Sequence, residues 1–118
     1  MEERAIIETA IQHLLQLTGI NVKEVNAQIE DKNTRRSPDG AIELEIGGKA
    51  YKFWIEVKNE LRHVHLPRLI NSLSEKKENW LLISQYLSKP NRALLKKENI
   101  NYLDSSGNCH IRKETLFI

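Results

Sequence analysis

The chain contains a single cysteine, Cys109, among its 118 residues, so it cannot form an internal disulfide bond. It has no apolar run near the ~20 residues that a membrane-spanning helix needs, and no charged-then-apolar signal peptide at its start. Internal repeats and low-complexity tracts are also absent. These absences exclude a disulfide framework and a helical membrane protein, and they predict an intracellular, cytoplasmic protein.

The length and composition are those of an ordinary globular domain. Apolar residues make up 40% of the chain, and 118 residues suit one domain with one hydrophobic core. The formal net charge is only +2, but a sequence pI near 8.7 is consistent with a polyanionic partner. We therefore expect one domain over residues 1–118, and the chemistry has to be inferred from the order of the residues.

The stretch from Pro38 to Lys58 predicts an antiparallel hairpin. Two runs of alternating apolar and polar residues flank Gly47 and Gly48. A two-residue glycine loop is a strong hairpin signal because glycine readily takes the positive φ of primed turns. With these glycines as the loop, Ile46 faces Lys49, and the rest of the register follows by counting back along both strands.

This register predicts two chemically different faces. One face carries apolar side chains suited to burial, namely Ile42, Leu44, Ile46, Tyr51, Phe53, Ile55 and Val57. On the other face Asp39 falls opposite Glu56, with Lys58 two residues further along. Opposed side chains have Cβ atoms about 4.5–5.5 Å apart, so two carboxylates placed this way repel each other. A divalent cation would offset the repulsion, because Mg²⁺ is usually held by one or two carboxylates together with waters and phosphate oxygens.

Lys58 completes a set suited to phosphodiester hydrolysis. On the same face as the two acids, it could orient or deprotonate a metal-bound water, or stabilise charge on the phosphorane. The plainer alternative is an ordinary exposed strand face, with Glu43 and Lys52 as a cross-strand ion pair. We predict that pair in either case, but it does not explain two opposed acids beside a lysine.

Pro38-Asp39, sixteen further residues and then Glu56-Val57-Lys58 form a motif that resembles the PD-(D/E)xK nuclease superfamily. The resemblance implies the restriction-endonuclease-like fold, an α/β sandwich with a mixed central β-sheet flanked by helices. It also implies a metal-dependent DNA endonuclease, in which Asp39 and Glu56 hold Mg²⁺ or Mn²⁺ and Lys58 assists the attacking water. The Val57 carbonyl would add a metal ligand.

The resemblance also suggests a glutamate from the first helix near the metal, and Glu8 is the matching residue. A solvent-facing helix acid is the alternative for Glu8, since Glu2 and Glu3 are available for the same role. A catalytically inactive DNA-binding or regulatory domain is the alternative function, because the sequence from Asp104 to Asn108 resembles a subgroup related to type IV toxin-antitoxin antitoxins. A tight turn is the simpler explanation of that sequence, and we favour it.

Basic residues bracket the predicted site. Arg35 and Arg36 precede Asp39, and Arg62 and Arg68 follow Lys58. Phosphate contacts from such residues position a DNA duplex without reading its sequence, although a solvated surface explains the same charges equally well.

A zinc site is not expected. His63 and His65 supply only half of a tetrahedral ligand set, and the remaining candidates, His13, Cys109 and His110, show no paired spacing.

The other elements follow from periodicity and capping. We expect helices over residues 2–17, 66–73 and 89–98, strands over 21–29 and within 79–87, a loop over 31–37, and two short strands around a turn at 104–108. Ser88 is the expected N-cap of the last helix, and Asn99 its stop. The apolar end ETLFI either closes a sheet, offers a homodimer interface, or marks a domain excised from a longer chain with further modules. This order predicts helices on both faces of a mixed sheet.

Overall fold

The computed structural model describes residues 3–18, 21–25, 39–73, 79–113 and 116–118. Within these ranges the helices are α1 (Glu3–Thr18), α2 (Leu66–Ser72) and α3 (Lys89–Lys97), with a 3-10 turn η1 (His63–His65) before α2. The strands are β1 (Asn21–Val25), β2 (Gly40–Ile46), β3 (Lys49–Lys58), β4 (Trp80–Ser84), β5 (Asn101–Asp104), β6 (Cys109–His110), β7 (Arg112–Lys113) and β8 (Leu116–Phe117). The predicted alternation of helices and strands is confirmed.

The central sheet is mixed. Its strands lie in the order β1-β2-β3-β4-β5-β6, and β7 pairs separately with β8. The pairs β1/β2, β2/β3 and β5/β6 are antiparallel, whereas β3/β4 and β4/β5 are parallel. The α/β class with a mixed sheet is therefore confirmed.

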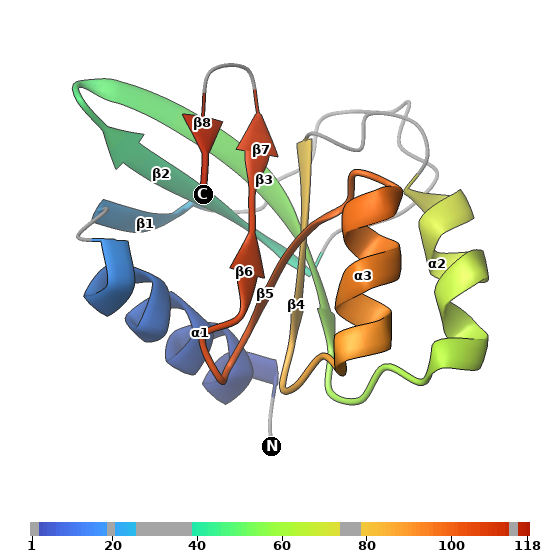
Figure 1. The fold of residues 1–118 in the computed structure, drawn as a ribbon. Coiled ribbons are helices and arrows are strands. Elements are labelled where there is room, and N and C mark those ends of the chain that lie inside the picture. The colour runs from blue at the N-terminus through green and yellow to red at the C-terminus, as the bar shows by residue number, and fades with distance from the viewer. Residues whose placement is uncertain (1–2, 19–20, 26–38, 74–78, 114–115) are drawn as a thin grey trace.

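The two parallel connections determine where the helices lie. The chain passes from β3 through α2 to β4, and from β4 through α3 to β5, moving in the same direction across the sheet each time. Parallel crossovers are almost always right-handed, so both helices are expected on one face. In Figure 1, α2 and α3 lie side by side and α1 lies apart from them.

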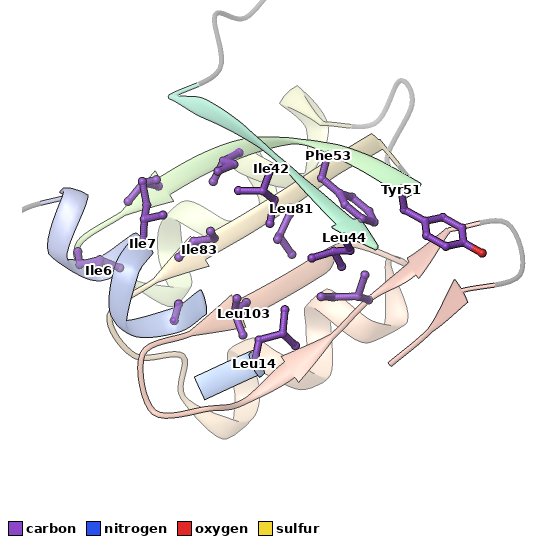
Figure 2. Packing of buried hydrophobic residues seen from close by; sticks show 14 of the residues in the cluster. Ile6, Ile7, Leu14, Ile42, Leu44, Tyr51, Phe53, Leu81, Ile83 and Leu103 are labelled. Carbon is purple, nitrogen blue, oxygen red and sulfur yellow. The ribbon is translucent and has the colours of Figure 1, made fainter. Parts of the chain in front are cut away.

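The hydrophobic residues form two clusters, one on each face of the sheet. Ile6, Ala10 and Leu14 of α1 recur at helical spacing and pack against one set of alternating strand residues. That cluster also contains Ile42, Leu44, Phe53, Ile55, Leu81, Ile83 and Leu103, most of them visible in Figure 2. In the second cluster, α2 and α3 pack against the strand residues of the other face, with Trp54, Trp80, Leu82 and Tyr102. Helices on both faces are thus confirmed.

Local sequence signals fix several element ends. Gly47 and Gly48 have φ of 57° and 81°, and Ile46 pairs with Lys49, so the predicted hairpin turn is confirmed. The amide of Asn91 donates to Ser88 Oγ at 3.4 Å, which makes Ser88 the N-cap of α3. Asn99 follows that helix with a positive φ of 59°.

The remaining predicted segments lie near the C-terminus and after α1. The C-terminal apolar run forms β8, and Leu116 is buried in the α1-side cluster. The predicted strand over 21–29 runs to Val25 in the described residues, and the predicted loop over 31–37 lies outside them. None of the described helices combines the length and apolar character needed to cross a membrane.

His110 gives the fold a dependence on pH. Burial lowers the pKa of His110 below its usual 6.5, and the nearby charges of Lys96 and Arg112 lower it further. The unfolded chain therefore binds more protons than the folded one below about pH 6.5, so the free energy of unfolding falls on acidification through that range and levels off below the lowered pKa. We expect urea denaturation at pH 7.5 and 5.5 to show this fall, and His110→Gln to reduce it. An equal fall in both proteins would contradict this role of His110.

Candidate active site

Two of the predicted site residues meet at the end of β3. Glu56 and Lys58 alternate with the buried residues of the α1 side, so both face the side of the sheet that α2 and α3 cover. Glu56 is only 4% exposed, and its Oε1 lies 3.4 Å from Lys58 Nζ. The Lys58 side chain is 38% exposed. A buried carboxylate thus pairs with a lysine side chain that is partly exposed to solvent.

Asp39 bonds to the main chain of the same part of β3. Its Oδ2 accepts a hydrogen bond from the amide of Val57 at 2.8 Å, and its own amide donates to the carbonyl of Ile55 at 2.9 Å. These two bonds fall on either side of Glu56. The structure therefore brings Asp39 against the Glu56-Val57-Lys58 segment.

The position of Asp39 differs in detail from simple counting. The predicted register holds from Gly40, opposite Ile55, to the hairpin turn. One residue earlier, outside β2, the amide of Asp39 also donates to the carbonyl of Ile55, so the regular pairing of the two strands ends at Gly40. The Asp39 carboxylate bonds to the amide of Val57, the residue after Glu56.

The oxygen atoms around this segment suit a hard cation. The amide and carbonyl of one strand residue point to the same side of the strand, so the Val57 carbonyl points toward Asp39, as its amide does. With Glu56, the segment offers two carboxylates and one carbonyl, which are the ligand types of Mg²⁺ and Mn²⁺. A backbone donor that fixes one carboxylate oxygen of Asp39 also orients the other. In the described residues, no three His, Cys, Asp or Glu side chains gather as a metal site.

A pocket adjoins Lys58 on the α2 side of the sheet. This basic pocket, about 550 Å³ in volume, is lined by Lys58, Glu60, Leu61, His65, Arg68, Leu69 and Ser72. Lys58 and Arg68, predicted from the sequence in separate roles, therefore share one cavity. His65 joins them from η1, a position that the sequence did not predict because it depends on the path between β3 and α2.

A second pocket lies next to the first. This tyrosine pocket, about 450 Å³ in volume, is lined by Asn59, Glu60, Leu61, Arg62, His63, Gln85, Tyr86, Ser88 and Asn91. Glu60 and Leu61 line both pockets and form the wall between them. Arg62 lines this second pocket rather than the first. The loops that follow the parallel strands β3 and β4 supply most of the lining, and such strand ends are a frequent ligand position in open α/β sheets.

Glu8 pairs with another residue of its own helix. Its Oε1 lies 3.1 Å from Arg4 Nε, and both side chains are exposed. Arg35 and Arg36 lie outside the described residues.

His63 has a partner within the protein. Its Nδ1 lies 2.7 Å from Asn91 Oδ1, while Asn91 Nδ2 donates to the carbonyl of Leu61 at 3.1 Å. That second bond sets the amide orientation, so Oδ1 is the acceptor and the His63 Nδ1 carries the hydrogen. Asn91 thus fixes the ring through Nδ1, and Nε2 is the nitrogen left for another partner.

The Asp104-to-Asn108 segment is a turn, as favoured from the sequence. Asp104 is fully buried, and its carboxylate accepts four hydrogen bonds. The donors are the amides of Leu87, Ser106 and Asn108 and the Asn108 side chain, at 2.9–3.0 Å. All four hydrogen bonds of this carboxylate therefore stabilise the fold.

Next to that turn, Cys109 is a weak nucleophile. Burial raises the pKa of its thiol, and the Asp104 charge raises it further. The thiol therefore stays protonated near neutral pH.

Comparison of the chain with protein-family models, with curated proteins and with solved structures finds no match. Any functional reading of this site therefore rests on its motif and its geometry.

Proposed function

We propose that this protein is a metal-dependent DNA endonuclease of the PD-(D/E)xK type, with a restriction-endonuclease-like fold. The observation that carries the proposal is the junction at the end of β3. There Asp39 bonds to the Val57 amide, and the side chains of Glu56 and Lys58 pair on either side of that residue. Three residues of one motif, Asp39, Glu56 and Lys58, thus lie together at the end of β3.

The surroundings of the junction support a phosphate substrate. Lys58 opens into the basic pocket together with Arg68 and His65. Arginine and lysine are the usual partners of phosphate oxygens, and contacts of this kind provide affinity for DNA of any sequence. The mixed α/β sheet, with the acids at the start of β2 and the end of β3, agrees with the expected fold.

The reaction we infer is hydrolysis of a phosphodiester. Water attacks the phosphorus, the bond to the leaving sugar oxygen breaks, and that oxygen takes up a proton. A Mg²⁺ or Mn²⁺ ion held by Asp39, Glu56 and the Val57 carbonyl would supply charge to the phosphate and an acidified water. Lys58 would orient the water and stabilise the negative charge that develops on the phosphoryl oxygens.

Lys58→Met tests this proposal directly. We expect the purified protein to nick supercoiled plasmid DNA in Mg²⁺ or Mn²⁺ and not in EDTA. The Lys58→Met variant should be slower by about 10²–10³-fold, the usual cost of removing one group that stabilises charge in the transition state. Agarose gels of a time course measure both rates, and thermal unfolding verifies that the variant is folded.

Lys52→Met is the matched control, since Lys52 is an exposed lysine on the same strand and face, with its Nζ over the Trp54 ring at 4.5 Å. It should cut like the unchanged protein. Equal cleavage by the Lys58 variant would contradict the assignment. DNA binding with no cleavage by any of the three proteins would favour the inactive, regulatory alternative.

A further inference from the structure

We propose that the tyrosine pocket receives an unpaired nucleobase of the DNA strand whose phosphate lies in the basic pocket. This inference rests on the proposed function and specifies its substrate class as DNA with a single-stranded nucleotide next to the cleavage site. It is argued from an exposed aromatic ring, an oriented hydrogen-bonding wall and the adjacency of the two pockets.

Tyr86 is the first observation. The residue is 58% exposed, although a large aromatic residue normally buries most of its surface. Tyr86 lines a concave site of about 450 Å³, a volume within the usual range of small-ligand pockets. Stacking on an exposed aromatic ring is the common way in which proteins hold single-stranded bases, because every base has a π-face.

The polar lining of the pocket is the second observation. His63 is held by Asn91 through Nδ1, which orients the ring and leaves Nε2 as its second hydrogen-bonding atom. Asn59 and Gln85 add side-chain amides, each with donor and acceptor atoms. An unpaired base exposes both kinds of atom on its Watson–Crick edge, which in a duplex is occupied by the complementary base.

The third observation is the arrangement of charge. The basic pocket, with Lys58 and Arg68, lies directly across the Glu60-Leu61 wall from the tyrosine pocket. A nucleotide likewise joins an anionic phosphate to a planar base through one sugar. The two adjoining pockets therefore match the two ends of one nucleotide.

Binding of DNA in EDTA tests the inference, because no metal-dependent cleavage then occurs. Fluorescence anisotropy would compare a labelled single-stranded oligonucleotide with a blunt duplex of the same sequence. We expect Tyr86→Ala to weaken binding of the single strand by about 10-fold, the loss typical of one stacked base, and to leave duplex binding within about 2-fold. Tyr86→Phe keeps the ring and should bind like the unchanged protein.

Val64→Ala is the matched control. Val64 is also an exposed apolar residue, 72% exposed, and it lines neither pocket. The variant should bind both DNAs normally. The inference is overturned if the unchanged protein does not bind the single strand, if Tyr86→Ala retains that binding, or if it loses single strand and duplex equally.

The two proposals fail separately. Normal binding through Tyr86 with no cleavage in Mg²⁺ or Mn²⁺ would remove the nuclease and keep the base pocket. Metal-dependent cleavage that needs Lys58, with no effect of Tyr86→Ala on binding, would do the reverse.

Discussion

Asp104→Ala is expected to lower the free energy of unfolding by about 3–5 kcal/mol, because hydrogen bonds to a charged group contribute about 1.5–3 kcal/mol each and are not additive. The substitution removes an acceptor of four bonds from a fully buried position. The most costly loss is the bond from the amide of Leu87, since Leu87 is itself fully buried and its amide cannot turn to water instead. Urea denaturation measures the change.

Two further variants make this test decisive. Asp104→Asn keeps the shape and part of the accepting capacity, so we expect an intermediate loss even if the alanine variant fails to fold. Asp39→Ala removes an exposed carboxylate that accepts one main-chain bond, and it should cost only about 1 kcal/mol. A change within 1 kcal/mol for Asp104→Ala would show that the turn holds without its carboxylate.

Glu56→Gln is expected to reduce cleavage by at least about 100-fold while changing the free energy of unfolding by less than about 1 kcal/mol. The amide has the same shape, and Lys58 is exposed enough to remain hydrated when its 3.4 Å partner becomes neutral. The lost charge, however, is one of the two that we propose for the metal. Millimolar Mg²⁺ should therefore raise the melting temperature of the unchanged protein and not that of the variant.

The opposite pattern would identify an ordinary structural ion pair. In that case Glu56→Gln would lower the melting temperature in EDTA, Mg²⁺ would not stabilise either protein, and any cleavage would persist. Glu43→Gln is the matched control, because Glu43 lies on the neighbouring strand directly opposite Lys52, away from the junction. It should leave both cleavage and the effect of Mg²⁺ unchanged.

Most of the fold was predictable because its signals are local. Gly47 and Gly48 set the turn and thereby the register of β2 and β3. Ser88 and Asn99 mark the two sides of α3 through capping and left-handed backbone geometry. These features depend on a few neighbouring residues, so a sequence pattern can identify them.

The details of the site were less predictable because they depend on distant segments. Counting along the hairpin gives only which paired residues are opposite, so it could not foresee that the Asp39 carboxylate, just before the paired stretch, would bond to the Val57 amide. The pockets are formed where loops after β3 and β4 approach each other, and no single stretch of sequence contains them. Arg68 was expected near DNA, but its sharing of a cavity with Lys58 required the tertiary structure.

The length of β3 makes the protein convenient to label. Its first residue, Lys49, and its last, Lys58, are separated by nine strand steps of about 3.3 Å, or about 30 Å in all. The hairpin tip is exposed, so a dye there would stand clear of the site yet within energy-transfer distance of a dye on the DNA that we propose as substrate. A cysteine introduced at exposed Glu45 would also react in preference to the protonated Cys109. The same hairpin that carries the motif thus provides a labelling position from which binding of the proposed DNA substrate can be followed by distance.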